Sequence, residues 1–339
     1  LHRVKLVMAK LIQKYLIESL ASGVFISGQV LGEVLGVSRT AVSKHVKVLK
    51  DMGLDIYSVR GKGYKLASPI NLLSRAKISD HLAQRNTNNK VEIHTIIDST
   101  NSYLMRKLYN HQLTDKNGLE QGQVCLAEYQ SDGRGRRGRQ WISPFGSHLY
   151  LSLYWQLEQG LAGAIGLSLV TALAVSDAIK ELVGIDVQLK WPNDIYIDGV
   201  KLAGVLIELE GQVTGPSDSV IGIGLNLCMP KKIARSIDQP WTDLQSHTEL
   251  PIDRNLFCAV IIACLTDRLK RHQDRGLIAM IDEWHQQDVY LDKEVRLITG
   301  DRITNGICRG IDNQGALLLE VDGVVKHIYG GEVSLRAAS

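Results

Sequence analysis

The sequence predicts an α+β protein of several domains, and three observations support this. The chain has 339 residues, which is enough for two or three domains at about 150 residues each. Its first 68 residues are basic and mostly helical in pattern, whereas strands alternate with helices from about residue 90. The segment after residue 289 consists of short strand patterns separated by turns. We therefore divide the chain into domains at 1–68, 75–288 and 289–339.

Composition separates the first domain from the others. Hydrophobic residues make up 45% of the chain and charged residues 22%, as in ordinary globular proteins. Residues 1–68 hold eleven Lys and Arg against four Asp and Glu, whereas the rest of the chain holds 28 against 32. A basic head on a slightly acidic body indicates that the head alone binds a polyanion.

Several protein classes are disfavoured by sequence. We expect no membrane span, because no run of about 18 apolar residues occurs, and no signal peptide, because Lys and Arg interrupt the first 20 residues. Five scattered cysteines without a CxxC pair indicate free thiols and a cytoplasmic protein. Ten histidines without an HxxxH pattern make a structural metal improbable.

Residues 4–52 predict three helices of a helix-turn-helix domain. Residues 4–20 form the first helix, and Ser27 and Ser38 are N-cap candidates for the next two, with the turn at Gly36-Val37. Three sets of apolar residues are expected to face the core: Val4, Val7, Leu11 and Leu20; Val30, Val34 and Leu35; and Val42, Val46, Leu49 and Met52.

The last of these helices carries a polar, mostly cationic ridge opposite its apolar face. Arg39, Ser43, Lys47 and Lys50 follow at i, i+4, i+8 and i+11, as a recognition helix in the DNA major groove requires. Strand patterns at 56–59 and 64–66 then enclose a basic tip, Arg60-Gly61-Lys62-Gly63, which resembles the wing of a winged helix-turn-helix. A solvated charged face is the alternative. The predicted DNA-binding residues are Ser38, Arg39, Thr40, Ser43, Lys44, Lys47, Lys50, Arg60 and Lys62.

The central domain is predicted as a sheet with a long apolar helix at 162–184. The expected strands are VEIHTIID (91–98), GQVCLAEYQ (122–130), HLYLSLYWQL (148–157), DVQLKWPNDIYI (186–197), KLAGVLIELE (201–210) and SVIGIGLNLCM (219–229).

The stretch GRGRRGRQW, residues 133–141, is predicted to be an ordered loop that binds a phosphate. It occurs once and strand patterns flank it, unlike a low-complexity arginine-glycine tract or a sorting signal. Glycines let backbone N–H groups converge on an anion, arginines neutralise its charge, and Trp141 offers a face to a purine. Neither GxxxxGK[ST] nor GxGxxG is present at a strand-to-helix turn.

Together with other motifs, this loop resembles the biotin protein ligases. QSDGRGRRGRQW (130–141), STN (99–101), KWPNDIY (190–196), KLAGVLIE (201–208) and GIGLN (222–226) occur in that family's order. With the basic head, the chain is similar to the bifunctional members, the biotin operon repressors. The resemblance implies a class II synthetase-like central domain and a C-terminal SH3-like barrel.

The implied activity is ATP-dependent biotin ligation. Biotin and ATP would give biotinyl-5′-AMP, and the biotinyl group would pass to a lysine of the biotin carboxyl carrier protein of acetyl-CoA carboxylase. The resemblance also implies repression of biotin synthesis genes at their operator DNA, by a homodimer that forms when biotinyl-5′-AMP binds as corepressor.

Site residues follow from the same resemblance. Lys201 and Arg136 are implied as catalytic, and Asp194 as a magnesium ligand. Without the resemblance, we would interpret Lys201 as a surface lysine at a turn, STN as a helix N-cap and Pro-Asn-Asp as an ordinary turn. The implied biotin-binding residues are Ser99, Thr100, Asn101, Gln130, Gly133, Arg134, Gly135, Arg136, Lys201 and Gly204. The implied adenylate-binding residues are Arg134, Arg136, Arg139, Trp141, Lys190, Asn193, Asp194 and Asn226.

One residue departs from the family's pattern, and two other functions are possible alternatives. The position before Trp141 is often basic in the family but is Gln140 here. A transcription factor that senses biotin without reacting is the alternative from another class, and intact Lys201 disfavours it. Lipoate ligases share the fold, but the GRGRRGR run and the DNA-binding head favour biotin.

Overall fold

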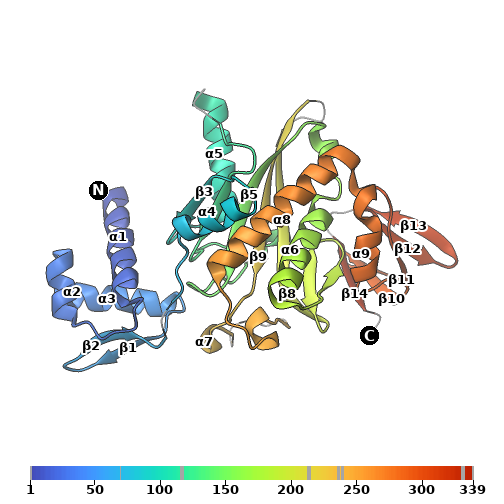
Figure 1. The fold of residues 1–339 in the computed structure, drawn as a ribbon. Helices are drawn as coiled ribbons and strands as arrows, with labels where there is room; N and C mark the ends of the chain where they lie inside the picture. Colours follow the sequence, from blue (N-terminus) through green and yellow to red (C-terminus); the bar gives the residue numbers. More distant parts are fainter. Residues whose placement is uncertain are drawn as a thin grey trace.

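A computed structural model describes residues 2–68, 70–114, 118–211, 215–234, 237, 240–329 and 333–337. Three parts follow one another along the chain, from the head at one end to a small sheet at the other (Figure 1).

The head is a helix-turn-helix with a hairpin, as predicted. It consists of α1 (His2–Leu20), α2 (Gly28–Leu35), α3 (Arg39–Asp51), β1 (Ile56–Val59) and β2 (Gly63–Leu66). The Ser27 hydroxyl accepts a hydrogen bond from the Val30 amide, and Ser38 accepts one from Ala41, so both caps are confirmed. Gly36 closes α2 in the left-handed conformation, with φ 63°. The two strands pair antiparallel, with Ile56 opposite Leu66.

Two of the predicted apolar faces in the head are wrong in part: Leu20 is buried and Leu35 packs against the core as predicted, but other members of the two sets do not. Leu11 is exposed, and the core side of α1 is formed by Ile12, Leu16, Ile17 and Leu20; the Val4 and Val7 side chains lie outside the described residues. On α2 the structure buries Leu31 and leaves Val30 and Val34 exposed. The reason is the tight turn into α3. A Cβ at Gly32 would lie 2.6 Å from the Val37 carbonyl oxygen, so α2 turns its Leu31–Gly32 side toward α3. The predicted stripe on α3, Val42, Val46, Leu49 and Met52, is buried.

A seven-stranded sheet forms the centre of the molecule. Its strands are β3 (Val91–His94), β4 (Val124–Ala127), β5 (Leu149–Leu157), β6 (Gln188–Lys190), β7 (Asp194–Ile197), β8 (Val200–Gly211) and β9 (Ser217–Leu225), in the order β3-β4-β5-β9-β8-β7-β6. Among the described strands of this sheet, β3 and β4 pair in parallel and the other neighbours pair antiparallel. The single strand predicted at 186–197 is wrong: the chain reverses at Trp191-Pro192-Asn193 and gives β6 and β7. Proline cannot donate to a strand ladder, so the run breaks there.

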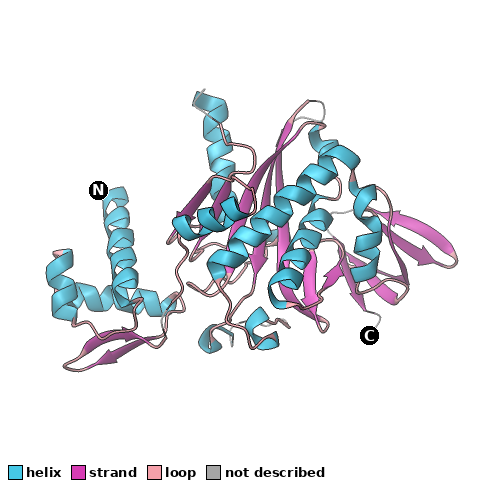
Figure 2. Ribbon diagram, in the orientation of Figure 1, coloured by secondary structure: helices cyan, strands magenta, loops and turns pink. Residues whose placement is uncertain are grey.

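Helices cover both faces of the sheet (Figure 2). One face packs against α4 (Arg75–Gln84), α6 (Leu167–Val183), α8 (Arg254–Arg275) and α9 (Ile281–Gln287), which enclose the main core. The segment Gly160–Val183 is long and apolar enough to cross a membrane, but α6 lies buried between the sheet and α8. The other face carries α5 (Thr100–Thr114) over β4, β5 and β9. A short helix, α7 (Lys231–Ala234), follows β9.

The C-terminal part is an antiparallel sheet, as the predicted short strands require. Its members are β10 (Glu294–Thr299), β11 (Arg302–Ile311), β12 (Leu317–Val321), β13 (Val324–Ile328) and β14 (Val333–Ala337), in the order β13-β12-β11-β10-β14. The Trp191 indole N–H donates to the Gly315 carbonyl oxygen over 3.0 Å. This bond joins the β6–β7 turn to the C-terminal sheet.

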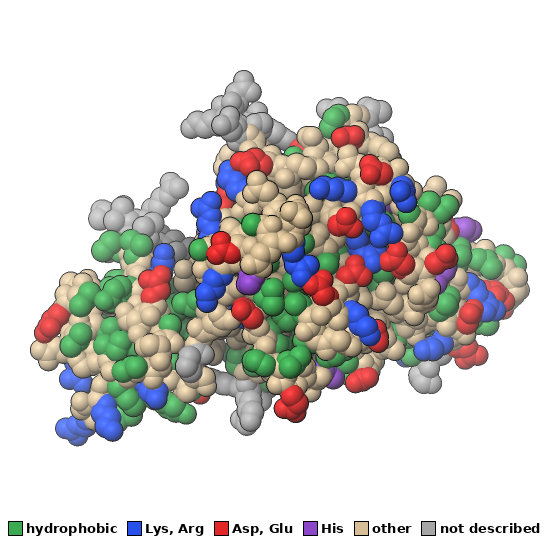
Figure 3. All heavy atoms as spheres, viewed as in Figure 1, with side chains coloured by type: hydrophobic (Ala, Val, Ile, Leu, Met, Phe, Trp, Pro, Cys, Tyr) green, Lys and Arg blue, Asp and Glu red, His purple; other side chains and the backbone are tan. Residues whose placement is uncertain are grey.

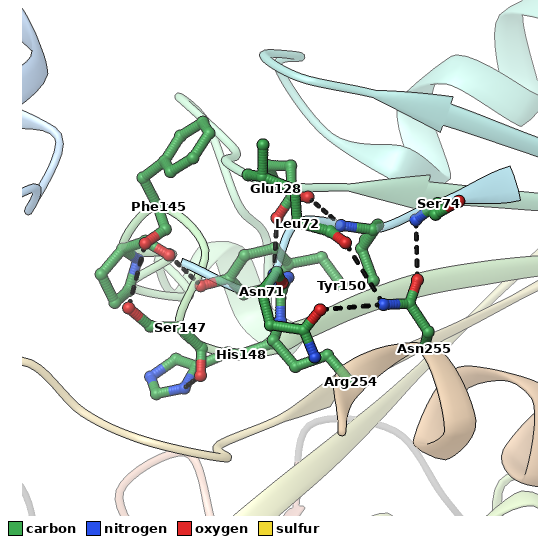
Figure 4. Close-up of polar contacts among 12 residues, drawn as sticks. Asn71, Leu72, Ser74, Glu128, Phe145, Ser147, His148, Tyr150, Arg254 and Asn255 are labelled. Atoms are coloured by element: carbon green, nitrogen blue, oxygen red, sulfur yellow. Dashed lines mark hydrogen bonds and ion pairs between the residues drawn. The ribbon is translucent and has the colours of Figure 1, made fainter. Parts of the chain in front are cut away.

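The loop at residues 143–148 belongs to the central domain and packs against the head. Phe145 is almost fully buried among the core side chains of the head, and its amide donates to the Met52 carbonyl oxygen over 3.0 Å. The Tyr150 hydroxyl donates to the carbonyl oxygen of Pro144 in the same loop. Linker residues 71–74 pass beside this loop (Figure 4). This loop therefore holds the head against the central sheet.

Candidate active site and DNA-binding surface

A cavity of about 1060 Å³, including its open mouth, lies on the face of the sheet that carries α5. The strands β8 and β9 form its floor, with Gly204 opposite Gly224 and Leu206 opposite Gly222. Glycines are required at these positions. A Cβ at Gly224 would lie 2.5 Å from the Trp141 ring, and one at Gly222 would lie 2.3 Å from the Asn101 side-chain oxygen.

The arginine-glycine loop is an ordered hairpin beside this floor. The Gly135 amide donates to the Arg139 carbonyl oxygen over 2.7 Å, and the Trp141 amide donates to Gly133 over 2.8 Å. The turn at its tip places Arg137 and Gly138 in the left-handed region, with φ 59° and 67°. A Cβ at Gly133 would lie 2.4 Å from the Trp141 carbonyl oxygen, so the close approach of the two arms requires glycine there.

One end of the cavity consists of neutral polar groups. The backbone amide and the hydroxyl of Thr100 both donate to the Gln130 side-chain oxygen, over 2.9 and 3.2 Å. The Gln130 amide group in turn donates to Ser143 over 3.1 Å. Ser152 on β5 lies 2.7 Å from the Thr100 hydroxyl and 2.5 Å from the Asn101 side-chain oxygen. This network holds the first turn of α5 rigidly against the sheet.

The other end is cationic. The Lys201 ammonium lies 2.6 Å from Asp194 and 5.5 Å from the centre of the Trp141 ring. Arg136 donates to the Asn193 side-chain oxygen over 3.1 Å, and Lys190 donates to the Tyr196 hydroxyl over 3.0 Å. Burial lowers the pKa values of Arg136 and Lys190 from their ordinary values, although Asp194 opposes the shift at both. Cations that are already partly desolvated attract an anionic ligand strongly.

Most of the predicted site residues meet in this one cavity. The residues that line it are Ser99, Thr100, Asn101, Gln130, Arg134, Gly135, Arg136, Arg139, Trp141, Lys190, Asn193, Asp194, Lys201 and Gly204. Gly133 and Asn226 do not line it. The Gly133 carbonyl oxygen accepts from the Trp141 amide across the hairpin, and the Asn226 side chain donates to the Thr242 carbonyl oxygen over 3.0 Å.

Sequence reasoning missed several residues at the cavity. Ser152, Gly222, Gly224 and Glu208 contact the predicted residues, and Ser334 and Leu335 of β14 reach the lining from the C-terminal sheet. Glu208 and the two glycines belong to motifs that the sequence made visible, and the alternation of residues along β8 and β9 places them on the cavity side.

Eight of the nine predicted DNA-binding residues are exposed on the head. Arg39, Thr40, Ser43, Lys44 and Lys47 are exposed along α3, as is Ser38 at its N-cap, and Arg60 and Lys62 are exposed at the hairpin tip. Lys50 is half-buried and donates to the Ser58 hydroxyl of β1 over 3.3 Å. Figure 3 shows Lys and Arg side chains along the lower edge of the head, over the hairpin.

Fold and site together define a class: a helix-turn-helix protein with an appended α+β domain that holds a polar, cation-lined ligand cavity. Three family models match the chain. The Biotin/lipoate A/B protein ligase family matches residues 94–226, the Biotin protein ligase C terminal domain matches 290–336, and an HTH domain matches 12–65.

Full-length relatives extend the match to nearly the whole chain. The Bifunctional ligase/repressor BirA of Salmonella typhimurium is 46% identical over 95% of this chain and 97% of its own, and that of Escherichia coli is 44% identical over the same shares. A structure of the biotin protein ligase from Aquifex aeolicus in complex with biotin and ATP is 28% identical. It covers 74% of this chain and 99% of its own, with a TM-score of 0.62. The chain belongs to the family of bifunctional biotin ligase/repressors.

Proposed function

We propose that this protein is an ATP-dependent biotin protein ligase that also represses transcription. It joins biotin to ATP, releases pyrophosphate, and transfers the biotinyl group from biotinyl-5′-AMP to a lysine of a biotin carboxyl carrier protein. The observation that carries the proposal is the cavity, in which a neutral polar end and a cationic end share one glycine floor.

The neutral end suits the ureido ring of biotin, which both donates and accepts hydrogen bonds. Ser99, Thr100, Asn101 and Gln130 supply side-chain groups of both kinds there. The ring system is otherwise apolar, and Leu151, Val205, Leu206 and Ile223 also line the cavity. A carboxylate on a chain extending from the ring is thereby directed along β8 toward Lys201.

The cationic end suits a triphosphate and a carboxylate that must approach each other. The carboxylate oxygen of biotin attacks the α-phosphorus and pyrophosphate leaves, so negative charge gathers on the oxygens around phosphorus. Lys201 and Arg136 neutralise this charge, with Arg139 and Lys190 in the same lining. Arg134 lines the cavity too but is paired with Glu208. Trp141 offers its ring to the adenine, and Asn193 lies in the same part of the cavity lining. In the second step the carrier amine attacks the acyl carbon, and AMP leaves.

Magnesium fits the donor set at Asp194. Magnesium binds through one or two carboxylates and substrate phosphates, and Asp194 is a carboxylate at the cationic end, in contact with Lys201. Within the described residues, no three His, Cys, Asp or Glu side chains gather as a metal site. Bound magnesium would neutralise phosphate charge.

The head supports the repressor function. We propose that α3 enters the major groove and the β1–β2 hairpin contacts the phosphate backbone of operator DNA at biotin synthesis genes. Binding of biotinyl-5′-AMP favours a homodimer, which presents two heads to a two-fold operator. Demand for biotin and repression then compete for one surface of the central domain.

Three finer assignments belong to the same proposal. We assign the five-stranded C-terminal sheet as the SH3-like barrel of the family; Ser334 and Leu335 of its strand β14 line the cavity. The central domain has the class II synthetase-like fold. The five cysteines are free, which fits a cytoplasmic protein.

Biotin-dependent exchange of pyrophosphate into ATP, followed by label transfer to a biotin carrier domain, tests the enzymatic function. We expect both steps. Binding of biotin without exchange would instead support the ligand-sensing transcription factor, and exchange with lipoate in place of biotin would support a lipoate ligase.

A further inference from the structure

Glu208 lies on β8 immediately behind the neutral end of the cavity. It is opposite Val220 of β9, on the same face as Gly204 and Leu206. It follows Gly204 by four positions, about 13 Å along an extended strand. Glu208 therefore lies at the opposite end of the site from Lys201, where the attack on phosphorus is proposed.

The Glu208 carboxylate contacts two residues that line the cavity. The Arg134 guanidinium donates to both carboxylate oxygens, over 2.9 and 2.7 Å. The Asn101 amide group donates to one of them over 2.9 Å. The carboxylate thus joins the start of the arginine-glycine hairpin to the first turn of α5, two segments 33 residues apart in sequence.

These contacts fix which way the Asn101 amide points. A carboxylate only accepts hydrogen bonds, so the nitrogen of Asn101 must face Glu208. The Asn101 oxygen then faces Ser152, 2.5 Å away, and lies against the backbone of Gly222. The Asn101 nitrogen also donates to the Leu206 carbonyl oxygen over the longer distance of 3.3 Å. Without the carboxylate, this bond and the contact with Ser152 hold the amide less firmly, and the Arg134 side chain regains its rotamer freedom.

We propose that Glu208 is a positioning residue for biotin: it orients Asn101 and holds Arg134 over the neutral end of the cavity, without contacting the reacting atoms. This inference rests on the proposed biotin ligase function. It predicts that loss of the Glu208 charge weakens biotin binding and leaves the chemistry at the far end of the site unchanged.

Kinetics of biotin-dependent pyrophosphate exchange test this assignment with Glu208→Gln. We expect the KM for biotin to rise about tenfold, in keeping with the loss of a charged hydrogen bond. The kcat and the KM for ATP should stay within about twofold of wild type. Glu210→Gln is the matched control, because Glu210 lies two residues further along β8, on the same face, and is exposed.

An unchanged KM for biotin, or an equal rise in the KM values for biotin and ATP, would overturn the assignment. A wild-type protein without exchange would instead contradict the proposed function itself. A second measurement compares the single variants Arg134→Gln and Glu208→Gln with the double variant Arg134→Gln/Glu208→Gln, which removes both charges. Its effect on KM should be smaller than the product of the two single effects, and a fully multiplicative effect would contradict the proposal.

Discussion

Arg254 and Glu128 form an ion pair whose two side chains are only 6% and 4% exposed, with 2.7 Å between nitrogen and oxygen. Arg254 also donates to the carbonyl oxygens of His148 and Asn71, and Glu128 accepts from the Leu73 amide. This ion pair thus joins four segments of the chain (Figure 4). They are the end of β4, helix α8, the loop whose Phe145 is buried in the head, and the interdomain linker.

We expect Arg254→Met to destabilise the protein by about 3–5 kcal/mol, because it leaves a buried carboxylate without its partner. Denaturant unfolding measures this, and limited proteolysis should show faster cleavage near residues 67–74. The control is Arg106→Met, which breaks an exposed pair with Asp98 and should cost under about 1 kcal/mol. If the two variants lost the same free energy of unfolding, burial would not be what makes the Arg254–Glu128 pair strong.

The local patterns of the sequence predicted the caps Ser27 and Ser38, the α3 stripe and the two strands of the cavity floor, since each depends on neighbouring residues. The same patterns did not predict which helix face is buried where that depends on a contact outside the helix. Val30 and Val34 have helical spacing for a buried face, yet the close approach of Gly32 to the Val37 carbonyl oxygen turns α2 the other way.

The site shows the same division. The motifs predicted the residues around the cavity, but sequence spacing alone could not reveal which of them contact each other. The bond from Glu208 to Arg134 spans 74 residues, and the Phe145 side chain belongs to the core of another domain. The alternation of β8 and β9 indicates the face on which Glu208 lies, but its partners depend on where α5 and the hairpin pack.

His148 predicts a pH dependence of stability. The ring is fully buried, and its Nδ1 lies 2.9 Å from the Ser147 carbonyl oxygen and 3.1 Å from the Leu227 amide nitrogen. Burial lowers the pKa of His148 to about 4; Arg254 adds to the shift, and Asp243 and a hydrogen bond to Ser147 oppose it. The unfolded chain therefore takes up this proton first as pH falls. The stabilisation is complete above about pH 6.5 and is lost progressively toward pH 4.

From about pH 7.5 to pH 5, this one group should lower the free energy of unfolding by about 2 kcal/mol. Urea unfolding of wild type and His148→Gln at the two pH values isolates the contribution. Glutamine can still accept a hydrogen bond from the Leu227 amide but does not titrate. Between the two pH values, the free energy of unfolding of His148→Gln should therefore fall by about 2 kcal/mol less than that of wild type. The same pH dependence in both proteins would assign the effect to other groups.

For the head, Arg39→Ala combined with Lys47→Ala should weaken operator binding. Both side chains are exposed on α3, and removing each phosphate-binding cation should reduce the slope of log K against log salt by about 0.9. Fluorescence anisotropy of an operator duplex at several salt concentrations measures this. Ligation should be unaffected, and so should DNA binding by Lys14→Ala, which lies exposed on α1 next to Glu18. An unchanged salt slope would place the DNA elsewhere on the molecule.

For the cationic end of the cavity, Lys201→Ala should lower the rate of biotin-dependent pyrophosphate exchange by about 10²- to 10³-fold. The lysine is proposed to stabilise charge that develops during the attack on phosphorus, and removing one such group typically has an effect of this size. Equilibrium binding of biotin should weaken by much less than exchange slows, because the ureido ring keeps its contacts at the other end of the site and only the carboxylate loses its cation. Lys180→Ala serves as the control, since Lys180 pairs with Asp186 at the surface. Near-normal exchange by Lys201→Ala would mean that Arg136 and Lys190 neutralise the phosphate without it, and that the pair with Asp194 is structural.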